Sequence, residues 1–91
     1  MKIVINQCHG GFGLSDEAME RYVKESGTTP AGNWDIARDD PTLVRIVEEM
    51  GSNAFTRFSD LKVVEVPDGV RWFIQEYDGM EWVAEAHRTW R

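Results

Sequence analysis

The pattern of apolar and polar residues predicts a strand and then a helix in the first third of the chain. The run Ile3-Val4-Ile5 is β-branched throughout, which favours a buried strand between Lys2 and Gln7. Farther on, an apolar face recurs at helical spacing and predicts a helix from about Asp16 to Ser26. Ser15 is a favourable N-cap for this helix, and Gly27 is a favourable stop.

A second helix is predicted between Asp40 and Gly51. Asp40 is a good capping residue, and Pro41 suits the first helical position because its missing N–H would have no partner there. The apolar residues that follow are spaced i, i+3, i+4 and i+7, and they are Leu43, Ile46, Val47 and Met50. A further short helical turn is expected between Ser52 and Asp60.

The connection from Thr28 to Asp39 is rich in turn-forming residues and breaks the helical period. Its length is near the upper limit for a structureless connection in a compact domain. We expect Trp34 and Ile36 to attach this connection to the core. Trp34 is also a candidate partner-binding residue, because Trp is favoured both in cores and at interfaces.

Three strands are predicted in the last third, at Leu61 to Val66, Val70 to Tyr77 and Met80 to His87. Asp78-Gly79 is a strong signal for a type I′ hairpin turn between the last two. A helix from Glu81 to Arg88 is an alternative, because Ala and Glu have low strand preference. The turn fixes an expected register of Tyr77 with Met80, Gln75 with Trp82 and Phe73 with Ala84 on one face, and Glu76 with Glu81, Ile74 with Val83, Trp72 with Glu85 and Val70 with His87 on the other.

The order of these elements is β-α-α-β-β-β, which predicts the α+β class. We expect residues 1–91 to form a small single domain with a mainly antiparallel sheet and two helices on one face. The first strand is expected to insert beside or between the late strands.

Charge and composition narrow the function classes. The net charge is −6, from 10 basic and 16 acidic residues, and this balance argues against nucleic acid as a partner. Cys8 is the only cysteine, so no internal disulfide is expected. No apolar run approaches the roughly 18 residues that span a bilayer. We therefore expect a cytoplasmic protein without membrane contact. The four Trp and an edge strand leave a homodimer open.

The segment from Cys8 to Ser15 is the first candidate site. A strand, a glycine-rich turn and a helix N-terminus together favour binding of a phosphate, carboxylate or nucleotide. Asp16 and Glu17 oppose an anion there, and a tight strand-to-helix connection is the structural alternative. The candidate ligand-binding residues are Asn6, Gly10, Gly11, Phe12, Gly13, Ser15, His87 and Arg88.

Other reactive residues do not form a recognisable catalytic or metal-binding pattern. Cys8, His9 and His87 lack the spacing of a zinc site, and a buried, inert Cys8 is the expected state. Glu76 and Glu81 are expected to face each other across the hairpin as a solvated pair. We predict no catalytic residue, no metal ligand and no cofactor. Arg88 and Trp90 are further candidate partner-binding residues, because both types are enriched at interface hot spots.

The chain resembles a family of small uncharacterised bacteriophage and prophage proteins. The stretches that carry the resemblance are Lys2 to Asn6 with Cys8 and Gly10 to Ser15, Arg38 to Pro41, Glu48 to Gly51, Leu61 to Asp68, Glu76 to Gly79, and Glu81 to Trp90. The resemblance implies a small phage-encoded accessory protein in the host cytoplasm. It carries over no activity.

The sequence thus predicts a non-enzymatic accessory protein that binds a host macromolecule, with a host protein, for example a defence protein, as its partner. The alternative is a binder of a small ligand or nucleotide that uses the turn from Gly10 to Ser15. A small hydrolase that uses Cys8 or the carboxylates is a third and weaker alternative.

Overall fold

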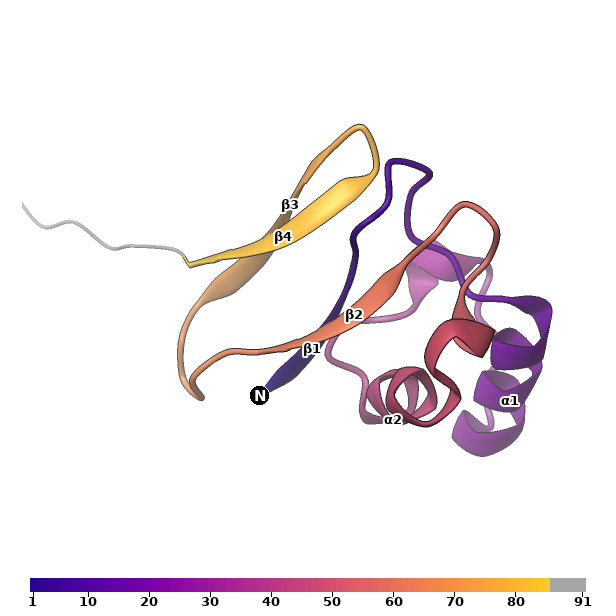
Figure 1. The fold of residues 1–91 in the computed structure, drawn as a ribbon. Helices are drawn as coiled ribbons and strands as arrows, with labels where there is room; N and C mark the ends of the chain where they lie inside the picture. Colours follow the sequence, from indigo (N-terminus) through magenta and orange to yellow (C-terminus); the bar gives the residue numbers. More distant parts are fainter. Residues whose placement is uncertain (86–91) are drawn as a thin grey trace, which may run out of the picture.

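The computed structural model describes residues 1–85 and shows an α+β fold, as the sequence predicts. Three candidate residues lie outside the described residues: His87, Arg88 and Trp90. The predicted pairing of Val70 with His87 therefore falls outside them as well. The elements follow in the order β1 (Lys2–Asn6), α1 (Asp16–Ser26), the 3-10 helix η1 (Asn33–Asp35), α2 (Pro41–Met50), the 3-10 helix η2 (Gly51–Ala54), β2 (Leu61–Glu65), β3 (Trp72–Tyr77) and β4 (Met80–Glu85) (Figure 1).

The four strands form two antiparallel pairs rather than one continuous sheet. β1 pairs with β2, from Lys2 opposite Glu65 to Asn6 opposite Leu61. β3 pairs with β4 in the predicted register. Asp78 and Gly79 form the turn with φ of 51° and 90°, and positive φ at both central residues is the signature of a type I′ turn.

The core lies between the two helices and the β1–β2 pair. Figure 1 shows both helices on one side of this pair, while the β3–β4 hairpin extends away from them. No residue of the hairpin belongs to the buried core of residues 1–85. The face of the hairpin that points away from the body is exposed to solvent. The buried core residues are Val4, Leu14, Ala18, Tyr22, Ile36, Leu43, Val44, Ile46, Val47, Ala54 and Leu61.

The connection between the helices is attached by only one of its two predicted anchors. Ile36 is buried, with 3% of its surface exposed, but Trp34 is 80% exposed. The expectation that Trp34 attaches the connection is therefore wrong. Its ring lies instead against Gly32, where the Cβ of any other residue would be 2.0 Å from a ring carbon.

Both helices begin and end as the sequence predicts. The Ser15 hydroxyl accepts a hydrogen bond from the Ala18 amide at 3.2 Å. The Asp40 carboxylate accepts one from the Thr42 amide at 2.8 Å. The Tyr22 hydroxyl donates to the second oxygen of Asp40 at 2.7 Å, so one carboxylate caps α2 and joins it to α1.

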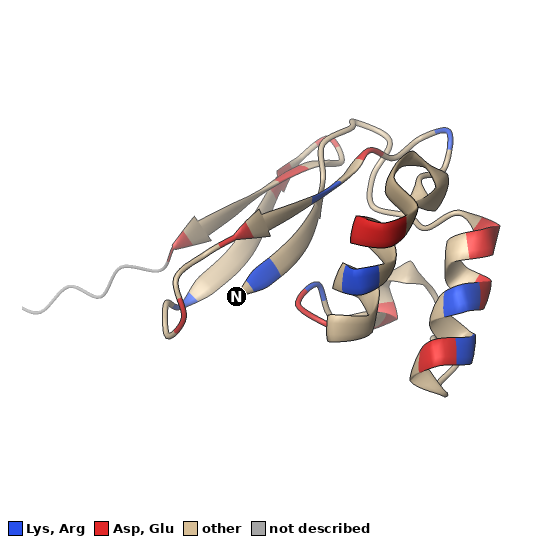
Figure 2. Ribbon diagram, turned by 60° about the horizontal axis from the view of Figure 1, so that its bottom comes forward, with Lys and Arg blue, Asp and Glu red and all other residues tan. Residues whose placement is uncertain are grey.

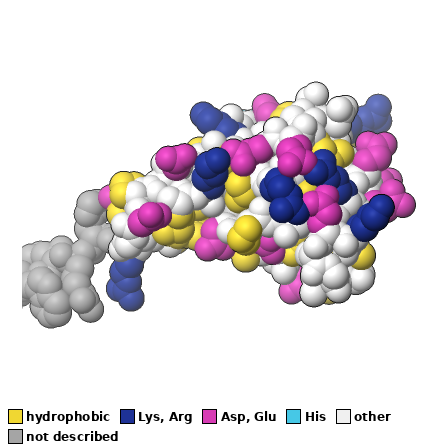
Figure 3. Space-filling model, turned by 90° about the horizontal axis from the view of Figure 1, so that it is seen from below, with side chains coloured by type: hydrophobic (Ala, Val, Ile, Leu, Met, Phe, Trp, Pro, Cys, Tyr) yellow, Lys and Arg dark blue, Asp and Glu magenta, His cyan; other side chains and the backbone are white. Residues whose placement is uncertain are grey.

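The outer surfaces of the helices carry alternating charges (Figures 2 and 3). Arg21 pairs with Glu25 and Glu49, and Arg45 also pairs with Glu25. The two guanidinium groups lower the pKa of the Glu25 carboxyl. Exposed pairs of this kind add little to stability, so this surface is best explained by solubility.

The bond between Tyr22 and Asp40 makes stability depend on pH at the alkaline end. Burial, and then the bond to the Asp40 carboxylate, raise the pKa of Tyr22 above its usual 10.0. The folded protein thus keeps the phenol proton at a pH where the unfolded chain loses it. The resulting stabilisation is fully present below about pH 10 and is lost as the pH rises through the pKa of Tyr22 in the folded protein. Urea unfolding at about pH 8 and about pH 11 should show a larger loss for the wild type than for Tyr22→Phe. Equal losses would contradict this.

Candidate functional site

The glycine-rich segment is a junction between two other parts of the chain. A Cβ at Gly10 would lie 2.0 Å from the Phe58 carbonyl oxygen. At the tip of the hairpin, a Cβ at Gly79 would lie 2.3 Å from the His9 carbonyl oxygen. Both glycines are therefore required for close approach of backbones. The segment touches the loop that holds Phe58 on one side and the hairpin turn on the other.

Several backbone groups around this turn are bonded within the protein. The Leu14 amide donates to the Asn33 side-chain oxygen at 3.1 Å, and the Ser15 amide donates to the Ala54 carbonyl at 2.9 Å. The Gly13 carbonyl accepts from the Ser59 hydroxyl at 2.9 Å. This geometry favours the structural alternative, and the predicted ligand site stays a prediction.

Asn6 is fully buried and joins three segments, although the sequence placed it among the ligand contacts. Its side-chain nitrogen donates to the carbonyls of Cys8 at 2.6 Å and Gly79 at 2.8 Å. Its side-chain oxygen accepts from the Asp60 amide at 2.8 Å. Because both side-chain donors are used, Asn6 holds the glycine-rich turn against the tip of the hairpin.

A largely buried ion pair lies beside Asn6 and joins the hairpin to the body of the protein. Arg38 binds both oxygens of Glu81, with 2.8 Å between Nη2 and Oε2, and the side chains are 19% and 9% exposed. Glu81 Oε1 also accepts from the Asn6 amide at 2.8 Å. The Arg38 guanidinium lies 3.7 Å from the centre of the Phe12 ring, which is a favourable cation–π contact.

This ion pair corrects the prediction for the two carboxylates of the hairpin. Glu76 and Glu81 are opposite each other, as expected. Only Glu76 is exposed, however, and the expectation of a solvated pair is wrong for Glu81, whose carboxylate is bound by Arg38. Sequence reasoning missed this role because Arg38 lies 43 residues away and no local pattern connects the two.

The outward face of the hairpin exposes four large apolar side chains. They are Phe73 at 41%, Tyr77 at 73%, Met80 at 36% and Trp82 at 45%, and we call these four residues the aromatic face. The Trp82 indole N–H donates to the Gln75 side-chain oxygen across the strands at 2.9 Å. The sequence predicted which residues share this face, but not that the face would be exposed.

Exposed carboxylates lie at the tip of the hairpin and on the side opposite the aromatic face. Between residues 70 and 85, the exposed acidic residues are Glu76, Asp78 and Glu85. The only basic residue in this range is Arg71, which is also exposed. Figure 2 colours the acidic and basic positions along the ribbon. Asp78 lies 3.8 Å from the imidazole of His9, and both side chains are more than half exposed. The exposed charges of the hairpin are therefore mainly acidic.

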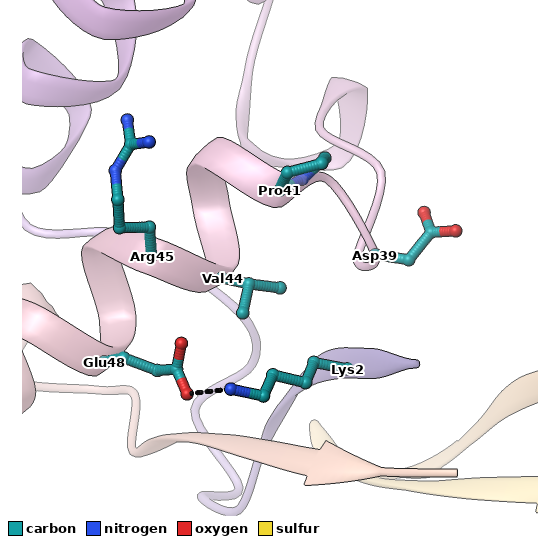
Figure 4. A pocket seen from close by; sticks show the side chains of 6 residues that line it. All are labelled: Lys2, Asp39, Pro41, Val44, Arg45 and Glu48. Atoms are coloured by element: carbon teal, nitrogen blue, oxygen red, sulfur yellow. Dashed lines mark hydrogen bonds and ion pairs between the residues drawn. The ribbon is translucent and has the colours of Figure 1, made fainter. Parts of the chain in front are cut away.

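A surface hollow beside α2 is lined mainly by charged side chains, unlike the apolar aromatic face (Figure 4). The Lys2 ammonium lies 2.8 Å from the Glu48 carboxylate, and this bond raises the pKa of Lys2. Arg45 is paired with Glu25 on α1. Both cations that line the hollow, Lys2 and Arg45, are thus already paired with carboxylates of the protein. The hollow therefore offers little to an anionic ligand. Its lining residues are Lys2, Asp39, Pro41, Val44, Arg45 and Glu48.

Comparisons with known proteins do not assign a function. No family model, curated protein or solved structure matches this chain. Among residues 1–85, no group of three His, Cys, Asp or Glu residues is placed to hold a metal ion. In the same part of the chain, no helix has the length and apolar character needed to cross a bilayer. Cys8 is half-buried rather than fully buried.

The Arg38–Glu81 pair can be tested with two chemically identical substitutions. Glu81→Gln should lower the free energy of unfolding by about 3 kcal/mol, because it leaves the Arg38 charge without its partner in a largely buried site. Glu76→Gln is the matched control on the opposite strand. The exposed Glu76 carboxylate accepts from the Gly79 amide at 2.8 Å, and a Gln side-chain oxygen can accept the same bond, so this change should alter stability by less than about 0.5 kcal/mol. Urea denaturation measures both. Equal effects would show that the ion pair does not hold the hairpin.

Proposed function

We propose that this chain is a non-enzymatic binding protein of phage or prophage type, and that its aromatic face contacts a host macromolecule. The observation that carries the proposal is the exposure of Phe73, Tyr77, Met80 and Trp82 on one side of one hairpin. Contiguous apolar patches of this kind on a small protein mark interaction surfaces, whereas single exposed apolar residues do not.

The way the hairpin is held supports this proposal. Glu81 is clamped by Arg38, and Gly79 is bound by Asn6, so both the strand and the tip are fixed to the body. A surface that is already ordered loses less conformational entropy when a partner binds. The aromatic face is thus presented in a form suited to binding.

The type of residue on this face also supports binding of a macromolecule. Tyr and Trp are the side chains most enriched at interface hot spots, because each offers a large apolar area together with a polar group. Trp34, a predicted partner-binding residue, is 80% exposed on another loop. It offers a second contact for a large partner.

The phage setting rests on the resemblance of the sequence alone. In that setting the partner is a host protein, for example a component of a defence system. An acidic protein of 91 residues is suited to occupy a basic site on such a partner.

The proposal is tested by capture from host lysate with matched variants. Tyr77→Ser removes the most exposed side chain of the aromatic face, and Phe58→Ser removes an aromatic ring that is 63% exposed elsewhere. We expect Tyr77→Ser to weaken capture of the partner by about 30-fold, as for a hot-spot residue, and Phe58→Ser to leave it unchanged. Titration of each immobilised variant against the partner measures this. Equal capture by Tyr77→Ser and the wild type would refute the proposal.

A further inference from the structure

Among residues 1–85, no strand pairs with the outer edge of β3, and the surroundings of this edge indicate what would cover it. We propose that this edge accepts an extended, basic segment of a partner protein as an added antiparallel strand. This inference rests on the proposed function and specifies the chemistry of the partner. Strand addition obtains affinity from main-chain hydrogen bonds and specificity from alternate side chains.

The geometry of the hairpin defines the groups on this edge. Within residues 1–85, β3 pairs with β4 alone. In a two-residue hairpin the pair next to the turn, here Tyr77 and Met80, exchanges both backbone hydrogen bonds. Alternate residues of β3 therefore point their N–H and C=O groups away from β4. These residues are Trp72, Ile74 and Glu76.

β3 lacks the features that usually protect an edge strand. Edge strands commonly carry Lys or Pro, or are interrupted by a bulge. β2 follows this rule, because it contains Lys62 and is followed closely by Pro67. β3 has the sequence Trp-Phe-Ile-Gln-Glu-Tyr, pairs with β4 without a bulge, and has Glu76 as its only charge. Its edge is thus suited to pairing.

The side chains beside this edge select the added segment. On one side, a new strand would extend the sheet next to Phe73 and Tyr77 and place apolar side chains against them. On the other side it would pass Trp72, Ile74 and the exposed carboxylate of Glu76, and Asp78 lies at the tip. A strand that alternates apolar residues with Arg or Lys satisfies both sides.

The same charges argue against a second copy of this chain. Each copy carries a net charge of −6, and like net charges oppose association of two copies. The complementary occupant is a basic segment of another protein.

The test uses the full chain and a displayed library of random 12-residue peptides. We expect the enriched peptides to alternate Arg or Lys with apolar residues, and a synthetic version of the strongest is then titrated by fluorescence polarisation. Glu76→Pro removes an outward N–H without removing a backbone bond to β4, and should weaken binding by more than about 10-fold. It also removes the side-chain acceptor of the Gly79 amide, a bond that Glu76→Gln can keep. Glu76→Gln keeps the N–H and removes only the charge, so it should weaken binding by about 2- to 5-fold.

A second measurement covers the case in which Glu76→Pro does not fold. Amide hydrogen exchange of the wild type should slow at Ile74 and Glu76 when the peptide is added, and should not change at Gln75, whose N–H already points to β4. Slowing confined to other segments would overturn strand addition.

The remaining outcomes separate this inference from the proposed function. If the library yields no basic peptide while capture of a host partner still depends on Tyr77, strand addition by a basic segment is refuted and the proposed function stands. If sedimentation shows a dimer that Glu76→Pro dissociates, the occupant is a second copy and the inference is refuted. Enriched peptides that bind Glu76→Pro as tightly as the wild type refute it as well.

Discussion

The position of the hairpin depends on the ion pair between Arg38 and Glu81. In the described residues, β1 and β4 do not pair as strands, so no backbone ladder joins the hairpin to the body. The carboxylate of Glu81 takes over that role by binding the Arg38 guanidinium and the Asn6 amide. A buried pair of this kind adds less to net stability than to the choice of one arrangement, because any displacement leaves a buried charge without its partner.

Close backbone contacts act together with this pair. The side-chain amide of Asn6 donates to the Gly79 carbonyl, and Gly79 has no side chain to hold the segments apart. Both features bring the tip of the hairpin against the turn that follows β1. The glycine-rich segment, which is the most unusual part of the sequence, thus serves to position the hairpin. This position leaves the aromatic face outward, and the proposed binding function depends on that orientation.

Local structure could be predicted from the sequence because its signals are local. Ser15 and Asp40 cap the helices, and Asp78-Gly79 fixes the hairpin register, through interactions within a few residues. The candidate site was predicted less well, because it depends on contacts between distant segments. The partner of Arg38 is 43 residues away. Whether an apolar side chain is buried, as at Ile36, or exposed, as at Phe73, depends on how the segments meet. Period and composition alone cannot determine such contacts.

The most direct test of the account is an amide and indole NMR titration of the full chain with its captured host partner. The account predicts that signals of the hairpin, including the Trp82 indole N–H and the amides of Ile74 and Glu76, shift on binding. It predicts that the amides from Gly10 to Ser15 keep their positions, except where they touch the hairpin tip. Large shifts confined to Gly10 to Ser15, with the hairpin unchanged, would contradict the account and support a site at the glycine-rich turn.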